Sequence, residues 1–128
     1  MNNCFIILAG GESKRFKSKR PKPYYLYRGK ALFQHSLDKA KESQKFQKIV
    51  LVINKKHKKF LINTNLKNIK IITGGNNRSE SSFKALKSIK NDNISKVLIH
   101  DAARPNFSLK LISNLFKGLK KNKCVVPV

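Results

Sequence analysis

A chain of 128 residues is long enough for one compact domain with a hydrophobic core and too short for two. Its 40% hydrophobic content argues against wholesale disorder, and no apolar run approaches the roughly 20 residues needed to span a bilayer. The N-terminus lacks the basic region, apolar stretch and cleavage site of a secretory signal, so we expect a cytoplasmic protein.

The formal charge is +23, from 29 Lys and Arg residues against 6 Asp and Glu residues. One interpretation is a non-catalytic nucleic-acid-binding domain, in which a basic face neutralises phosphates. The lysines are instead spread along the whole chain, and most aromatic residues lie within apolar patterns. We therefore expect no nucleic-acid partner, although such a charge still attracts small anions such as nucleotides.

Five short apolar runs rich in β-branched residues predict strands, at residues 5–8, 49–53, 69–72, 97–99 and 125–126. They show no polar alternation, which is typical of strands buried on both faces of a parallel sheet. Three amphipathic segments between them predict helices, at residues 31–43, 79–90 and 108–121. Residues 56–68 are less regular and predict one short helix and a loop. This alternation predicts an α/β fold with an open, mostly parallel sheet and covering helices.

The helical periodicity also predicts which side chains are buried. The first helix is expected to bury Leu32, Phe33, Ser36, Leu37 and Ala40. The second is expected to bury Ser82, Phe83, Leu86 and Ile89, and the third Leu111, Ile112, Leu115, Phe116 and Leu119. Ser79 and Ser108 are the expected N-caps of the second and third helices. Cys4 and Cys124 lie in apolar segments and are expected to be buried, inert thiols rather than disulfide or zinc ligands.

The chain ends directly after the strand predicted at residues 125–126. A finished α/β domain normally continues into another covering element. We therefore expect residues 1–128 to form the N-terminal part of a single domain that is incomplete at its C-terminus.

Three loops are expected to meet at one edge of the sheet. In open parallel sheets, ligands bind beyond the carboxyl ends of the strands, near the point where the strand order reverses. The loops that follow Leu8, Ile72 and Ile99 should lie at that edge, and every unusual residue cluster of the sequence falls within them. We expect the binding site there.

The first loop begins Leu-Ala-Gly-Gly-Glu-Ser-Lys-Arg directly after the first strand. The small residues Ala9, Gly10 and Gly11 let the backbone approach a ligand closely, and successive N–H groups can bind an anion. Arg15 adds a planar guanidinium suited to phosphate oxygens, and Lys22 follows between two prolines that stiffen its backbone. The loop matches neither a Walker A loop nor the dinucleotide-binding glycine pattern.

The second loop, Gly-Gly-Asn-Asn-Arg-Ser-Glu-Ser-Ser over residues 74–82, combines a glycine turn with a helix N-terminus that attracts anions. Ordinary capping is the alternative explanation. The third loop is His-Asp-Ala-Ala-Arg-Pro from residue 100. Here Asp101 suits a metal or sugar hydroxyl and Arg104 suits a phosphate, unless the two form a structural ion pair. His100 is expected to be packed or hydrogen-bonded, without a catalytic role.

These motifs, in this order, resemble the nucleotidyltransferases that activate sugar and polyol phosphates. The opening Leu-Ala-Gly-Gly-x-Ser-x-Arg and the Pro21-Lys22 pair are shared widely, including by molybdopterin guanylyltransferases. The second motif, Gly-Gly-x-x-Arg-x-x-Ser, and the His-Asp-Ala-Ala-Arg-Pro motif together resemble the 2-C-methyl-D-erythritol 4-phosphate cytidylyltransferase family of the non-mevalonate isoprenoid pathway. Ribitol-phosphate cytidylyltransferases are the nearest alternative. The resemblance implies a Rossmann-like nucleotide-diphospho-sugar transferase fold.

The resemblance also implies a reaction, in which CTP transfers its cytidylyl group to the polyol phosphate and releases pyrophosphate. It implies that Arg15 and Lys22 are catalytic and stabilise charge on the α-phosphate and the leaving group. The implied nucleotide-binding residues are Ala9, Gly10, Gly11, Gly75, Asn76, Arg78, Ser81 and Asp101. Asp101 and Arg104 would contact the substrate, and Asp101 would bind Mg²⁺ that bridges the triphosphate oxygens. A homodimer is implied for the full-length protein.

Two positions depart from the family pattern, since Ser13 stands where a second glycine is usual and Gly10 where alanine is common. Both replacements are small, so we expect little effect on the loop. The family's later substrate-positioning Arg and Lys residues and its dimerisation arm would follow Val128. We therefore expect this piece alone to bind CTP weakly and not to turn over.

Overall fold

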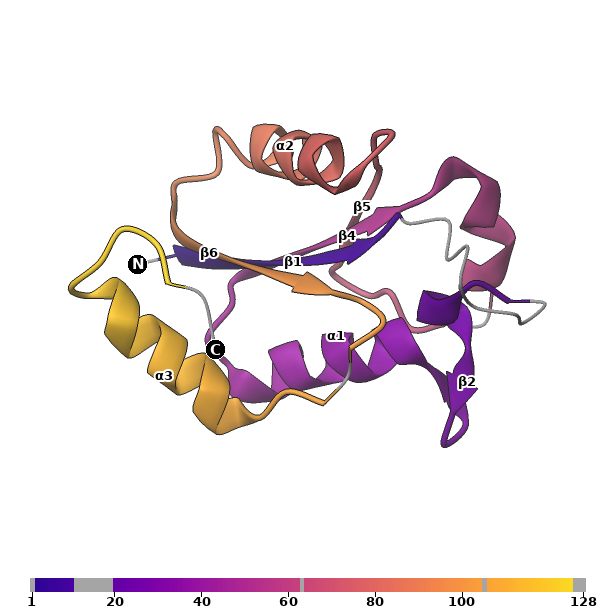
Figure 1. Ribbon diagram of the computed structural model, residues 1–128, viewed down its shortest axis with the longest axis horizontal. Coiled ribbons are helices and arrows are strands. Elements are labelled where there is room, and N and C mark those ends of the chain that lie inside the picture. Colours follow the sequence, from indigo (N-terminus) through magenta and orange to yellow (C-terminus); the bar gives the residue numbers. More distant parts are fainter. Residues whose placement is uncertain (1, 11–19, 63, 105, 126–128) are drawn as a thin grey trace.

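The computed structural model describes residues 2–10, 20–62, 64–104 and 106–125. Four strands form one sheet in which every neighbouring pair is parallel, in the spatial order β5 (Lys70–Thr73), β4 (Lys48–Ile53), β1 (Asn2–Ala9) and β6 (Ile94–Asp101). Helix α2 (Arg78–Ser88) covers one face, and helices α1 (Leu32–Ser43) and α3 (Leu109–Leu119) cover the other (Figure 1). The predicted α/β fold with an open parallel sheet is confirmed.

The strand order reverses at β1. The chain runs from β1 to β4 and β5 on one side, and then crosses back to β6 on the other side of β1. Ala9 pairs with Ile53 of β4, and Leu8 pairs with Asp101 of β6, so these strands end level with one another. The crevice that accepts ligands in such sheets is therefore expected beyond Ala9.

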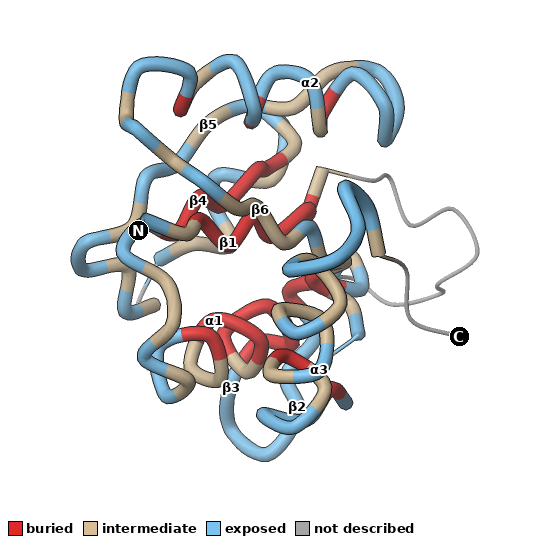
Figure 2. The backbone as a smooth tube through the Cα atoms, turned by 90° about the vertical axis from the view of Figure 1, so that its left-hand side faces the viewer, coloured by how far each residue is buried: buried red, intermediate tan, exposed pale blue. Residues whose placement is uncertain are grey.

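Strands β1 and β4 form the centre of the core, as the buried segments in Figure 2 show. Successive residues of a strand point to opposite faces, so β1 serves both layers. Phe5 and Ile7 belong to the cluster on the α1 and α3 side, whereas Cys4 and Ile6 belong to the cluster on the α2 side. All four are fully buried. The continuous apolar run of β1 thus reflects burial on both faces.

The outer strands of the described sheet are less buried than predicted. Ile71 of β5 is 40% exposed and Ile99 of β6 is 37% exposed, because each strand pairs on one side only within the described residues. The prediction of burial on both faces is therefore wrong for β5 and β6. The strand predicted at residues 125–126 is also wrong at Val125, which belongs to no strand, while Val126 lies outside the described residues.

Helix α1 buries the face predicted for it, whereas of the residues predicted to be buried by the second helix only Ile89 is buried. Phe83 is 65% exposed and Leu86 is 41% exposed. The buried positions are Ser81, Ala85 and, just after the helix, Ile89, which repeat every four residues and place small side chains against the sheet. Of the face predicted for the third helix, only Ile112 is fully buried in α3.

The N-caps differ in the same way. The Oγ atom of Ser108 accepts a hydrogen bond from the Leu111 backbone N–H at 3.0 Å, so the predicted cap of α3 is confirmed. Helix α2 is capped by Asn77 instead of Ser79, since the Asn77 Oδ1 atom accepts from the Glu80 backbone N–H at 2.9 Å. Asparagine is an equally good capping residue, and this one lies two positions earlier.

Two short elements between β1 and α1 were not predicted: the 3-10 helix η1 (Lys22–Tyr24) and a hairpin of β2 (Leu26–Tyr27) and β3 (Lys30–Ala31). Arg28 and Gly29 both have positive φ angles, of 50° and 80°, as a two-residue hairpin turn requires. The segment predicted as a short helix and a loop contains a second 3-10 helix, η2 (Lys55–Leu61).

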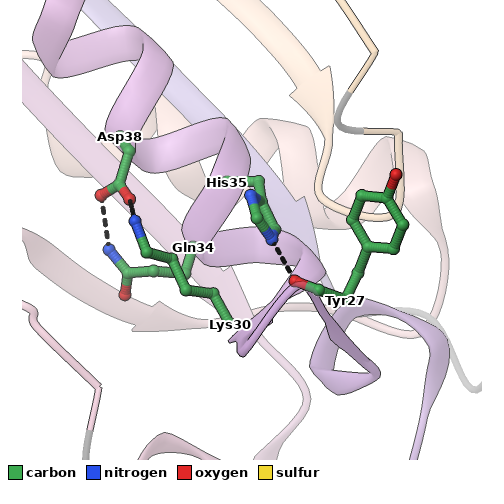
Figure 3. A network of polar contacts seen from close by, with 5 residues as sticks. All are labelled: Tyr27, Lys30, Gln34, His35 and Asp38. Carbon is green, nitrogen blue, oxygen red and sulfur yellow. Dashed lines mark hydrogen bonds and ion pairs between the residues drawn. The ribbon is translucent and has the colours of Figure 1, made fainter.

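Side chains fasten the hairpin to helix α1 (Figure 3). The Lys30 ammonium and the Gln34 amide each donate to Asp38 at 2.8 Å, and a ring nitrogen of His35 lies 2.6 Å from the Tyr27 carbonyl oxygen. Burial raises the pKa of Asp38, but the hydrogen bonds from Lys30 and Gln34 outweigh it and hold that pKa below its ordinary value. The network ties the hairpin that follows η1 to helix α1.

The two cysteines behave differently. Cys4 is fully buried in β1, and burial raises the pKa of its thiol to about 11, as expected for an inert core residue. Cys124 is an exposed free cysteine, so the prediction that it is buried is wrong. Among the described residues, no helix is long and apolar enough to cross a bilayer.

Candidate active site

A cavity of about 620 Å³ lies beyond the carboxyl ends of β1, β4, β5 and β6. Its walls come from the loops after all four strands and from η1. The lining residues that matter below are Gly10, Lys22, Asn54, Lys55, Lys56, Gly74, Gly75, Asn76, Arg78, Ser81, Asp101 and Arg104. The three loops predicted to meet at one edge of the sheet therefore do meet, at the point where the strand order reverses.

Close backbone approaches form one side of the cavity. A Cβ atom added to Gly74 would lie 2.5 Å from the Ser81 Oγ atom and 3.0 Å from a methyl group of Val52. A Cβ atom on Gly10 would lie 3.5 Å from the same hydroxyl oxygen. The glycines of two loops thus pack on one buried serine, and at Gly74 only a residue without a side chain fits.

The Gly75-Asn76 turn is held by the first turn of helix α2. The Gly75 N–H donates to the Ser81 Oγ atom at 3.1 Å, and the Asn76 N–H donates to a carboxylate oxygen of Glu80 at 2.7 Å. Asn77 caps the helix at the same place. These bonds give the turn one conformation, so Asn76 and the carbonyl groups around it stand in fixed positions on the cavity wall.

A carboxylate between two guanidinium groups forms another wall. Asp101, the last residue of β6, is ion-paired with Arg78 at the start of α2. The second oxygen of Asp101 lies 3.8 Å from the Nε atom of Arg104, so the predicted Asp101–Arg104 ion pair is present as well. The two arginines carry more positive charge than the single carboxylate neutralises, and both side chains are more than half exposed to the cavity and solvent. This arrangement attracts anions.

His100 packs behind this wall. Its ring lies 4.4 Å from the Phe107 ring, centre to centre, and its Nε2 atom lies 2.5 Å from the Arg104 carbonyl oxygen. Burial lowers the pKa of His100 below its ordinary value, so the ring is neutral near pH 7 and donates its N–H to that carbonyl. His100 therefore closes the loop that carries Asp101 and Arg104, in agreement with the packed role predicted for it.

Comparison with known proteins identifies the family. The model of the family described as IspD, 2-C-methyl-D-erythritol 4-phosphate cytidylyltransferase, matches residues 3–128. The chain belongs to the IspD family. It is 65% identical over 127 residues to the bifunctional enzyme IspD/IspF of Pelagibacter ubique, and 38% identical over 121 residues to the 2-C-methyl-D-erythritol 4-phosphate cytidylyltransferase of Fusobacterium nucleatum.

Solved structures of the IspD family share the fold. The cytidylyltransferase of Francisella tularensis is 31% identical, with a TM-score of 0.77 over 95% of this chain and 54% of its own. The bifunctional IspDF of Campylobacter jejuni is 29% identical, with a TM-score of 0.78 over 94% of this chain and 31% of its own. The match to the Pelagibacter protein covers 99% of this chain and 34% of that protein. The match to the Fusobacterium protein covers 90% of this chain and 52% of that protein. This chain spans between 31% and 54% of the length of these relatives.

Most site residues predicted from the IspD motifs line the cavity: Gly10, Lys22, Gly75, Asn76, Arg78, Ser81, Asp101 and Arg104. Ala9 ends β1 with its side chain buried and leads directly into Gly10. Gly11 and Arg15 lie outside the described residues. The structure therefore brings together the described members of the motifs, although they lie up to 94 positions apart, from Gly10 to Arg104.

The sequence interpretation missed a fourth loop. Asn54, Lys55 and Lys56 follow β4 and line the same cavity. The rule that placed the other three loops applies here too, because β4 also ends at this edge. A single asparagine and two lysines carry no distinctive signal in a chain with 29 Lys and Arg residues, so the sequence alone does not mark this segment.

Proposed function

We propose that this chain is the nucleotide-binding part of an enzyme that transfers a cytidylyl group from CTP to 2-C-methyl-D-erythritol 4-phosphate. The products are CDP-methylerythritol and pyrophosphate. The observation that carries the proposal is the single cavity that gathers the IspD motifs from the ends of three strands. Its cationic lining suits a nucleoside triphosphate and a phosphorylated acceptor.

The reaction needs no nucleophile from the protein. A phosphate oxygen of the acceptor attacks the α-phosphorus of CTP, the bond from that phosphorus to the bridging oxygen breaks, and pyrophosphate leaves. Negative charge builds on the α-phosphate and the leaving group, where Lys22 and Arg15 would stabilise it. Losing one such preorganised charge lowers the rate by about 10² to 10³.

The nucleoside end would lie between the glycines of the first two loops. Gly10 and Gly75 allow close approach of a flat base, while Asn76 and Ser81 offer polar groups at fixed positions. Asp101 and Arg78 would contact the ribose and phosphates, and Arg104 the acceptor. This arrangement would frame cytosine and ribose through backbone and small side chains, as the family motifs imply.

Magnesium fits this cavity as an ion bound mainly through the nucleotide. Within the described residues, Asp101 is the carboxylate that lines the cavity, and no three or more His, Cys, Asp or Glu side chains are grouped to hold a metal. Mg²⁺ commonly uses one or two carboxylates with phosphate oxygens and water. Each carboxylate oxygen has two lone pairs, so Asp101 can accept from arginine and still bind a cation. The ion would neutralise charge on the triphosphate.

The remaining parts of the proposal concern the whole protein. Residues 1–128 would be the N-terminal part of a single cytidylyltransferase domain, because the chain covers about half of the cytidylyltransferase of Fusobacterium nucleatum. The full-length enzyme would be a cytoplasmic homodimer. These expectations rest on the family resemblance, and gel filtration with light scattering of the full-length protein tests the dimer.

Calorimetric titration of the full-length protein with CTP, GTP and UTP, each with Mg²⁺, tests the nucleotide. We expect CTP to bind best, and preference for GTP would contradict the proposal. In a pyrophosphate-release assay, Arg15→Ala and Lys22→Ala should each lower turnover about 10² to 10³ fold. Binding to a DNA duplex should change little in these variants, because a dispersed charge governs it.

A further inference from the structure

The loop after β4 forms a cationic wall of the cavity that the family motifs do not include. Lys55 and Lys56 open the 3-10 helix η2, and both line the cavity with exposed side chains. They stand beside Gly10 of the first loop and in the same cavity as Lys22. Other lysines of η2, such as Lys58, are equally exposed but do not line it.

Within the described residues, no carboxylate neutralises the charges of this wall. Arg78, which follows β5, and Arg104, which follows β6, are both ion-paired with Asp101. In the part of the chain that the structure describes, no carboxylate forms an ion pair with Lys55 or Lys56. Two ammonium groups on a cavity wall, with no counter-ion among the residues that the structure describes, favour an anionic ligand over a neutral one.

Asn54 holds this wall against the glycine loop. Its side-chain amide donates to the Gly10 carbonyl oxygen at 3.3 Å, and its Oδ1 atom accepts from the Lys56 backbone N–H at 3.0 Å. The backbone N–H of His57 also donates to the Asn54 carbonyl oxygen, at 2.9 Å. One residue therefore fixes the backbone of both lysines relative to Gly10, which distinguishes them from lysines on a solvated surface.

We propose that Lys55 and Lys56 bind the phosphate groups of the nucleotide, and that Asn54 is the positioning residue that presents them. The inference rests on the proposed nucleotide-binding function and adds two charged residues to that site. Because both side chains reach the cavity from a partly exposed loop, each contact should resemble an exposed ion pair and contribute about three- to fivefold in affinity.

The test compares Lys55→Gln, Lys56→Gln and the double variant of the full-length protein with Lys58→Gln, which removes the same charge from the same helix outside the cavity. The dissociation constant of CTP with Mg²⁺ is measured by calorimetry, and that of cytidine by competition against CTP. We expect CTP to bind about three- to fivefold more weakly in each single variant, and about tenfold or more weakly in the double variant. The affinity for cytidine should be unchanged in the Lys55 and Lys56 variants, and Lys58→Gln should bind CTP as tightly as the wild type.

Three binding results would overturn the inference. They are an unchanged CTP affinity, an equal loss for CTP and cytidine, and an equal loss in Lys58→Gln. A rise in the KM of the acceptor with an unchanged KM for CTP would also overturn it, because the lysines would then serve the other phosphate. If the wild-type protein does not bind CTP at all, the proposed function itself fails, so the two failures are distinguishable. Asn54→Ala should weaken the binding of CTP as the lysine variants do. Asn65→Ala should not, although it removes a similar hydrogen bond, from the Lys67 backbone N–H to the Asn65 side chain.

Discussion

Substituting Gly74 by alanine tests the close packing beneath the nucleotide site. The added Cβ atom would lie 2.5 Å from the Ser81 Oγ atom and 3.0 Å from a Val52 methyl group. Neither neighbour can move easily, because Ser81 accepts a hydrogen bond from Gly75 and Val52 is fully buried. Overpacking of this kind costs about 1–3 kcal/mol, and the short contact places Gly74→Ala in the upper half of that range.

A double-mutant cycle isolates the contact responsible. Ser81→Ala alone removes the hydroxyl and leaves the Gly75 N–H without its partner, at a cost of about 1 kcal/mol. In the double variant the new Cβ atom no longer meets an oxygen. Its loss of stability should therefore be smaller than the sum of the two single losses by about 1 kcal/mol or more. The free energies of unfolding come from urea titration of each variant of the full-length protein.

Ser79→Ala is the matched control, since Ser79 is an exposed serine on the same helix that does not cap it. The loss of stability in Ser79→Ala should be small, and it should add to the loss in Gly74→Ala without coupling. A Gly74→Ala variant as stable as the wild type, or a strictly additive pair with Ser81→Ala, would refute the reasoning from the contact distances.

Three further predictions concern Tyr24, His100 and the two cysteines. Tyr24→Phe should raise the free energy of unfolding by about 1 kcal/mol in urea titration, because the Tyr24 hydroxyl is buried without a hydrogen-bond partner among the described residues; a loss of stability would contradict this. Burial lowers the pKa of His100 below 6.5 in the folded protein, so the unfolded chain binds a proton at this residue at a higher pH than the folded protein does. The contribution of neutral His100 to stability is therefore intact above about pH 7 and is lost as the pH falls below 6.5. His100→Gln should flatten that part of the stability–pH curve, and an unchanged slope would count against the assignment. Iodoacetamide at pH 8 should label Cys124 of the folded 128-residue chain within minutes, but should label Cys4 only in urea. Peptide mass spectrometry identifies the labelled cysteine, and early labelling of Cys4 would show that β1 is accessible.

The features predicted correctly from the sequence are those that a local pattern determines. The apolar runs of β1 and β4 record burial on both faces, and the spacing of apolar residues in α1 records the face it buries. The hairpin was missed because two-residue strands have no periodicity, and because its turn carries Arg28 where asparagine or aspartate would signal a positive φ angle. Phe83 was misplaced because small residues on the other face of α2 determine which side meets the sheet.

One rule predicted part of the site: in open parallel sheets, ligands bind beyond the carboxyl ends of the strands. That rule placed the loops containing Gly10, Gly75 and Asp101 together, and the cavity contains all three. The ion pair between Arg78 and Asp101 joins residues 23 positions apart on two different elements, so no local spacing could predict it. The role of Asn54 was not predictable for a different reason, since its side chain bonds to the backbone of a loop 44 positions away, which leaves no local pattern.

The parallel pairing of β1 has a consequence for how the chain folds. Its first partner, β4, begins 44 positions after Cys4, and its second, β6, pairs Leu8 with Asp101. Parallel contacts of such long range make folding slow, since chain entropy is lost before the contacts form. A ribosome adding about 5–20 residues per second would leave β1, which is apolar from Cys4 to Ala9, without its second neighbour for several seconds. Because the cavity requires the ends of all four strands, nucleotide binding should appear only after β6 has been synthesised.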